Sequence, residues 1–87
     1  MTTAPKIAPE LIWQHLEDNT IVVTPTSGKV RVLNGVGTLI WQHLNDGSDL
    51  SQIVDAITDA YDVDRARAEA DLADFIEDLT DRGILVK

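Results

Sequence analysis

Residues 29–44 read KVRVLNGVGTLIWQHL, and the spacing of the apolar residues changes within this stretch. Between Lys29 and Leu33, charged and aliphatic residues alternate with a period of two, which predicts a β-strand. After Asn34 the apolar residues recur at the three- and four-residue spacing of one helical face, at Val36, Leu39, Ile40 and Leu44. The stretch therefore predicts a strand, a turn and a helix in succession.

Two further strands are expected earlier, near Leu11–Leu16 and Thr20–Thr24, because β-branched and aromatic residues are frequent there. Turn-forming residues separate the strands at residues 17–19 and 25–28. Consecutive hairpins then give a three-stranded antiparallel sheet. Residues 1–9 contain two prolines and no clear periodicity, so we expect a flexible arm followed by one domain over residues 10–87.

Three helices are expected after this sheet. Gly47 ends the first helix, and Asp49 with Gln52 forms a capping box at the start of the second. Asp64 caps the third helix, which continues until Gly83. The predicted buried stripes are Leu50, Ile53, Val54, Ile57 and Tyr61 in the second helix and Ala68, Leu72, Phe75, Ile76 and Leu79 in the third. The expected fold class is α+β, with three strands followed by three helices as in a winged helix-turn-helix.

The hexapeptide LIWQHL occurs twice, at residues 11–16 and 39–44. A structural repeat would continue beyond six residues, yet the first copy precedes a strand-like run and the second a capped helix. The context predicts a strand for the first copy and a helix for the second. A helix that opens at Pro9–Glu10 is an open alternative for the first copy.

Composition argues against catalysis. The 87 residues include no cysteine, which removes thiolate nucleophiles and zinc–thiolate sites. His15 and His43 have no second histidine or carboxylate at ligand spacing, and the serines lack a nucleophile setting. We expect no enzyme, no metal and no cofactor.

Charge and hydropathy restrict the partners. A net charge of -8 opposes binding to phosphate backbones, and residues 62–82 carry eight acidic side chains against three arginines. That third helix is therefore a poor reader of DNA. No apolar run approaches the roughly 20 residues that span a bilayer. We expect a cytoplasmic protein that binds neither nucleic acid nor membrane. Similarity to acyl carrier proteins is rejected, since residues 48–50 read Ser-Asp-Leu rather than Asp-Ser-Leu.

A set of helix starts, turn glycines and core positions has a characteristic spacing. These residues are Leu33, Asn34, Gly37, Ile40, Trp41, Leu44, Gly47, Ile53, Val54, Tyr61, Asp71, Phe75, Leu79, Gly83 and Ile84. In this spacing the chain resembles the PqqD family. The resemblance covers residues 33–86 closely and the preceding strands loosely.

This resemblance implies a function. Members are winged helix-turn-helix domains that bind the leader segment of ribosomally made precursor peptides without doing chemistry. The chain is most similar to the stand-alone leader-binding proteins of lasso peptide biosynthesis, which implies a leader peptidase and a cyclase as further partners. A peptide chaperone of the pyrroloquinoline quinone type and a regulatory interaction domain are alternatives. We expect a monomer or a weak dimer.

In the family the leader adds as an antiparallel strand beside the third strand and lies against the third helix. A terminal strand offers the unpaired backbone groups that strand addition needs. The expected binding residues on the strand are Lys29, Val30, Arg31, Val32 and Leu33, and those on the helix are Arg67, Asp71, Leu72, Asp74, Phe75 and Asp78. The apolar members are expected to form pocket walls, and the aspartates to receive basic leader residues.

Overall fold

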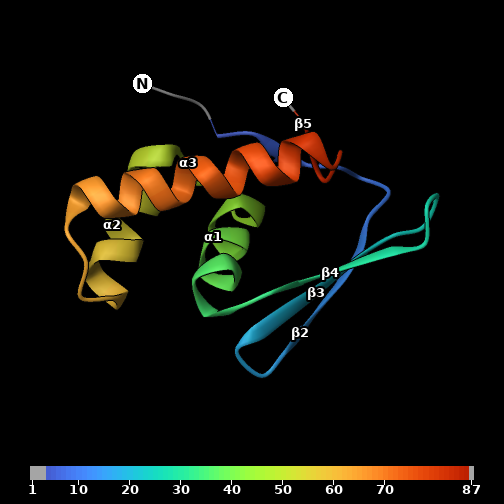
Figure 1. The fold of residues 1–87 in the computed structure, drawn as a ribbon, viewed down its shortest axis with the longest axis horizontal. Helices are drawn as coiled ribbons and strands as arrows, with labels where there is room; N and C mark the ends of the chain where they lie inside the picture. The colour runs from blue at the N-terminus through green and yellow to red at the C-terminus, as the bar shows by residue number, and fades with distance from the viewer. Residues whose placement is uncertain (1–3, 87) are drawn as a thin grey trace.

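The computed structural model describes residues 4–86, which form three helices and five strands (Figure 1). The fold class is α+β, as expected, but strands lie at both ends of the chain. The elements are β1 (Lys6–Ile7), β2 (Ile12–Leu16), β3 (Asn19–Thr24), β4 (Lys29–Leu33), α1 (Gly35–Asn45), α2 (Leu50–Ala60), α3 (Arg65–Asp81) and β5 (Leu85–Val86).

The main sheet is antiparallel, in the order β2-β3-β4. The three predicted strands are confirmed, and the alternative of a helix opening at Pro9–Glu10 is wrong because residues 12–16 pair with β3. A two-residue connection joins β2 to β3, with Glu17 at a φ of 58°. Gly28, at a φ of 71°, ends the loop between β3 and β4, where its N–H donates to the Thr24 carbonyl at 2.8 Å.

A second, two-stranded sheet joins the two ends of the chain. Lys6 pairs with Val86 and Ile7 with Leu85, and the Ala8 N–H donates to the Ile84 carbonyl at 3.0 Å. The expectation of only three strands is therefore wrong. Of the arm expected over residues 1–9, residues 6–8 pair with the C-terminal end of the chain, while residues 1–3 lie outside the described part. Local periodicity misses this strand because its partner is about 80 residues away along the chain.

The predicted starts of the second and third helices are confirmed, and the structure adds a cap for the first helix. The Asn34 side chain accepts from the Gly37 N–H at 3.2 Å and caps α1. Asp49 and Gln52 form the capping box of α2, and Asp64 caps α3. The helices also end near the predicted glycines, since α1 ends two residues before Gly47 and α3 two residues before Gly83.

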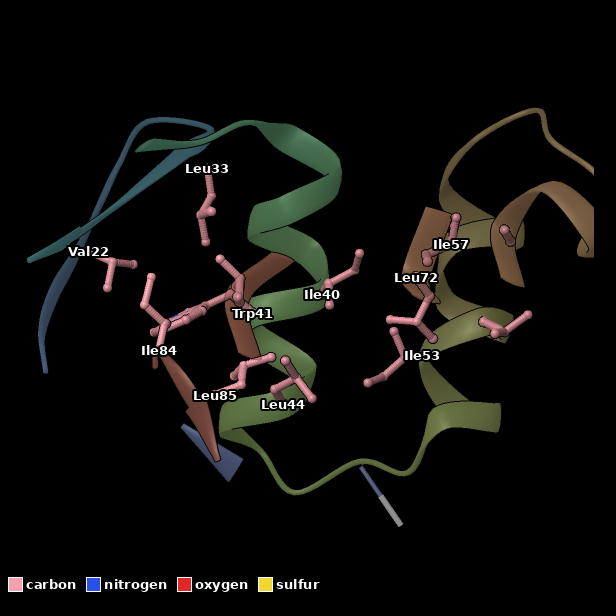
Figure 2. Packing of buried hydrophobic residues seen from close by; sticks show 13 residues of the cluster. Val22, Leu33, Ile40, Trp41, Leu44, Ile53, Ile57, Leu72, Ile84 and Leu85 are labelled. Carbon is pink, nitrogen blue, oxygen red and sulfur yellow. The ribbon is translucent and has the colours of Figure 1, made fainter. Parts of the chain in front are cut away.

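The hydrophobic core surrounds α1. Figure 2 shows Val22 and Leu33 of the main sheet on one side of this helix and Ile53, Ile57 and Leu72 of the other helices on the opposite side. Trp41, the largest fully buried side chain, lies at the centre. The predicted helical stripes are buried or partly buried except at Tyr61. The prediction for Tyr61 is wrong, because this residue follows α2 and is 37% exposed.

Candidate functional site

The outer edge of β4 carries unpaired main-chain groups. Within residues 4–86, β4 pairs with β3 on one side and with no strand on the other. The two-residue hairpin makes Leu16 and Asn19 a hydrogen-bonded pair. Along an antiparallel ladder, hydrogen-bonded pairs alternate with pairs that are not hydrogen-bonded. Successive residues of β3 thus bond to β2 and β4 in turn. The N–H and C=O groups of Val30 and Val32 therefore point toward the free edge.

The side chains of β4 alternate between the two faces of the sheet. Arg31 pairs with the buried Val22, so odd-numbered residues of β4 face the helices, and Leu33 is only 3% exposed. Val30 and Val32 lie on the opposite face and are 61% and 60% exposed. Of the predicted apolar walls on this strand, the structure places Leu33 toward the helices and turns the two valine side chains away.

A cleft of about 350 Å³ lies where β4, the start of α1 and the middle of α3 meet. Its lining combines apolar, polar and charged residues. The lining residues are Arg31, Val32, Leu33, Asn34, Val36, Gly37, Ile40, Asp71 and Phe75. The contribution of α1 was missed as a binding surface from sequence. The signal was present, because α1 begins two residues after β4 and its first turn therefore lies near the end of that strand.

Gly37 lets the Phe75 ring lie close to the first turn of α1. A Cβ atom at this position would lie 3.1 Å from Phe75 Cε1 and 3.2 Å from Leu33 Cβ. Both distances are tighter than ordinary packing of a methyl group. The absence of a side chain at Gly37 therefore sets the position of the aromatic wall of the cleft.

An ion pair crosses the groove between β4 and α3. Arg31 Nη2 donates to Asp78 Oδ2 at 2.7 Å, and Arg82 Nε donates to Asp78 Oδ1 at 3.0 Å. Asp71 at the cleft rim accepts from Arg67 Nε at 3.2 Å, one turn earlier on α3. Both carboxylates are already paired with arginines of the chain. Asp74 lies exposed on the same helix.

Leu72 is the predicted wall residue that the structure does not bring to the cleft. It is 4% exposed and lines a separate cavity of about 170 Å³ between α2 and α3, with Leu50, Val54 and Ile76. Positions 72 and 75 are neighbours on one helical face, but α3 lies between α2 and the cleft, so the two side chains meet different partners. Phe75 faces the cleft, whereas Leu72 faces α2.

Fold and site together define a small α+β domain with a vacant strand edge beside a helix-lined cleft. The family described as "Coenzyme PQQ synthesis protein D (PqqD)" matches residues 19–85. The chain belongs to the PqqD family.

Two solved structures are similar over nearly the whole chain. One is described as "TbiB1 in Complex with the TbiA(beta) Leader Peptide"; it is 35% identical, with a TM-score of 0.88, over 92% of this chain and 93% of that one. The other, "Lasso peptide synthetase B1 complexed with the leader peptide", is 27% identical, with a TM-score of 0.87, over 94% and 96%. No curated protein matches the sequence.

Proposed function

We propose that the chain binds the leader segment of a ribosomally made precursor peptide as an additional antiparallel strand beside β4. The unpaired edge of β4 next to an apolar cleft is the observation that carries this proposal. Strand addition uses main-chain hydrogen bonds for affinity and side-chain pockets for selection. Two similar proteins in solved structures are complexed with leader peptides, which supports leader binding by this chain.

The cleft is needed because backbone pairing alone binds weakly. Four to five new hydrogen bonds at about 1 kcal/mol each roughly offset the about 2–5 kcal/mol that ordering a flexible peptide costs. Micromolar affinity requires about 8 kcal/mol in total. Apolar burial on the order of 200–300 Å² supplies the difference. Val36 and Phe75, which are both partly exposed, are apolar cleft residues that a leader side chain can cover.

The proposed role is delivery rather than catalysis. A leader held in extended form raises the local concentration of its precursor near a leader peptidase and a cyclase of lasso peptide biosynthesis. Precursors made on ribosomes meet such a protein in the cytoplasm, its predicted location. Within residues 4–86, no helix is both long and apolar enough to cross a membrane.

The scaffold that carries this role is proposed to be a winged helix-turn-helix in which the β3–β4 hairpin is the wing. The proposed oligomeric state is a monomer or a weak dimer. On the outer face of the sheet, the large exposed aliphatic residues are Ile12, Leu16, Val30 and Val32. This patch is small beside the roughly 20–30 residues, or about 800 Å², that each partner of a stable complex buries.

A peptide chaperone of pyrroloquinoline quinone synthesis is the second candidate, favoured by the description of the matching family. Both candidates bind a precursor peptide at the same edge. They differ in the peptide that binds, so titration with both kinds of precursor separates them.

Substitution of Val32 by proline tests the strand-addition mechanism. Val32→Pro removes an N–H that points away from β3, so the ladder with β3 persists while the incoming strand loses a donor. We expect at least a tenfold loss of affinity for the leader of the precursor encoded beside this chain, measured by calorimetry. Val32→Thr is the matched control, because it keeps both the N–H and the β-branched shape. Unchanged affinity of the proline variant, with an unchanged circular dichroism spectrum, contradicts the mechanism.

Substitution of Phe75 by alanine tests the cleft. Phe75→Ala removes the aromatic wall beside Gly37, and we expect leader affinity to fall at least tenfold. Ile76→Ala is the control on the neighbouring position of α3, because Ile76 lines the cavity toward α2. A loss of thermal stability without a loss of affinity would assign Phe75 to the core alone.

A further inference from the structure

The groove between β4 and α3 continues beyond the Arg31–Asp78 ion pair. A second pocket of about 260 Å³ lies at the Lys29 end of β4, against the C-terminal end of α3. Its charged lining residues are Lys29, Arg31, Asp81 and Arg82. The groove thus has an apolar end near Phe75 and a charged end near Arg82, separated by one ion pair.

The charged end is basic on an otherwise acidic protein. The whole chain has seven lysines and arginines and a net charge of -8, yet three of those basic residues line this one pocket. Asp78 is shared between Arg31 and Arg82, so a single carboxylate bonds to two guanidinium groups. Counting Lys29, Arg31 and Arg82 against Asp78 and Asp81 leaves one positive charge. The pocket therefore attracts an anion where most of the surface repels one.

Arg31 has donor capacity that its ion pair does not use. Its Nη2 is bonded to Asp78 and its Nε is buried, but the side chain is 42% exposed, so the terminal nitrogens of the guanidinium group are accessible to a peptide. A guanidinium group carries five donor hydrogens, which suits it to hold a second carboxylate. Arg31 lines both the apolar cleft and the basic pocket, so a peptide that follows β4 passes over it.

The direction of β4 orders the two ends for an incoming strand. The chain runs from Lys29 at the basic end to Leu33 at the apolar end. An antiparallel partner runs the other way and meets the apolar cleft first. Its side chains alternate, so only every second residue faces the helices. Residues of the partner opposite Leu33, Arg31 and Lys29 are therefore two residues apart from one another.

We propose that the basic pocket at Lys29, Arg31 and Arg82 binds an aspartate or glutamate of the leader, located two or four residues C-terminal to the apolar residue that fills the Phe75 cleft. This inference rests on the proposed leader binding and adds a specificity rule to it. The rule selects both the spacing and the N-to-C direction of the peptide. An odd spacing places the carboxylate on the outer face of the sheet, away from the pocket.

The test uses the fluorescein-labelled leader of the precursor encoded beside this chain. Each aspartate and glutamate of the peptide is replaced singly by its amide, and each large apolar residue by alanine. The anchor is the apolar residue whose replacement weakens binding to the unaltered chain but not to Phe75→Ala. We expect about a three- to tenfold loss for the acidic residue two or four positions after this anchor, since partly exposed charge pairs contribute modestly. Acidic residues elsewhere change affinity less.

The chain is altered in parallel as Lys29→Gln and Arg82→Gln. Each variant loses a similar factor with the unaltered leader and loses nothing further with the amide leader. Arg65→Gln is the matched control, because it removes one positive charge on α3 from a residue paired with Asp55 at 2.7 Å, outside the groove. Circular dichroism establishes that all three variants fold. The two test residues are exposed, so a fold defect in Arg82→Gln leaves Lys29→Gln as the second probe.

The outcomes distinguish a failure of this inference from a failure of the proposed leader binding. In the first outcome, Val32→Pro weakens leader binding, but Lys29→Gln and Arg82→Gln weaken it no more than Arg65→Gln does. This result overturns the basic pocket and leaves strand addition intact. A cognate leader that binds but has no carboxylate at either spacing also overturns the basic pocket and leaves strand addition intact. A leader that does not bind the unaltered chain at all overturns both.

Discussion

The two copies of LIWQHL have identical sequences and opposite structures. Residues 12–16 of the first copy form β2, whereas residues 39–44 of the second lie within α1. In the first copy Ile12 and Leu16 are 63% and 54% exposed. Their counterparts Ile40 and Leu44 are 1% and 6% exposed. The same isoleucine and final leucine therefore lie in the core in one copy and on the outer face of a sheet in the other.

The difference shows how weakly six residues determine their own conformation. Isoleucine, tryptophan and leucine are tolerated in both states, and the propensity differences are a few tenths of a kcal/mol per residue. The flanking residues decide which conformation each copy adopts. Asn34 caps a helix before the second copy, while a two-residue turn after the first copy leads directly into the β-branched strand β3.

The two copies also pack against each other. Trp13 and Trp41 meet edge to face, with ring centroids 5.7 Å apart and an angle of 76° between the planes. This geometry is the favoured one for aromatic pairs. Trp41 is fully buried and Trp13 only partly, so the pair joins the core to the edge of the sheet.

The tryptophans give the largest expected difference between the copies. Trp41→Ala should lower the free energy of unfolding by about 3–5 kcal/mol, because it opens a cavity at the centre of the core. Trp13→Ala should cost about 1–2 kcal/mol, since solvent already reaches this side chain. Urea unfolding followed by circular dichroism measures both. Equal losses would mean that the buried and half-buried copies contribute alike.

The leucines give the next largest difference. Leu44→Ala should lower the free energy of unfolding by about 2–4 kcal/mol, whereas Leu16→Ala should cost at most about 0.5 kcal/mol. The same urea titrations apply, and the midpoints should separate clearly while the slopes stay equal. A large loss from Leu16→Ala would show that the outer face of the sheet is covered, for example by a second copy of the chain.

The histidines give the smallest expected difference in stability, and here the first copy contributes more than the second. His15 Nδ1 and Thr20 Oγ1 share a 2.8 Å hydrogen bond, and Thr20 in turn donates to Thr38 Oγ1 at 2.9 Å inside the core. His43 Nδ1 and Ser48 Oγ are 3.3 Å apart near the end of α1. We expect His15→Ala to cost about 1 kcal/mol and His43→Ala about half of that, measured as shifts of the thermal midpoint. A larger effect at His43 would contradict the ranking.

The candidate site was only partly predictable. Free backbone at β4 follows from its place as the last strand of a meander, and Phe75 follows from the family resemblance. The outward direction of Val30 and Val32 and the turn of Leu72 toward α2 depend on packing partners far along the chain. The sequence likewise did not predict that Asp78 pairs with two arginines, one of them 47 residues away along the chain.

Local signals in the sequence determined the element types, the helix caps and the order of the main sheet, because turns and caps act within a few residues. Only the tertiary structure decided that β1 pairs with β5, that Leu72 turns toward α2 while Phe75 faces the cleft, and that the groove beside β4 has an apolar and a basic end. Each of these depends on contacts between distant residues, whose free energy exceeds the small local preferences that a sequence displays.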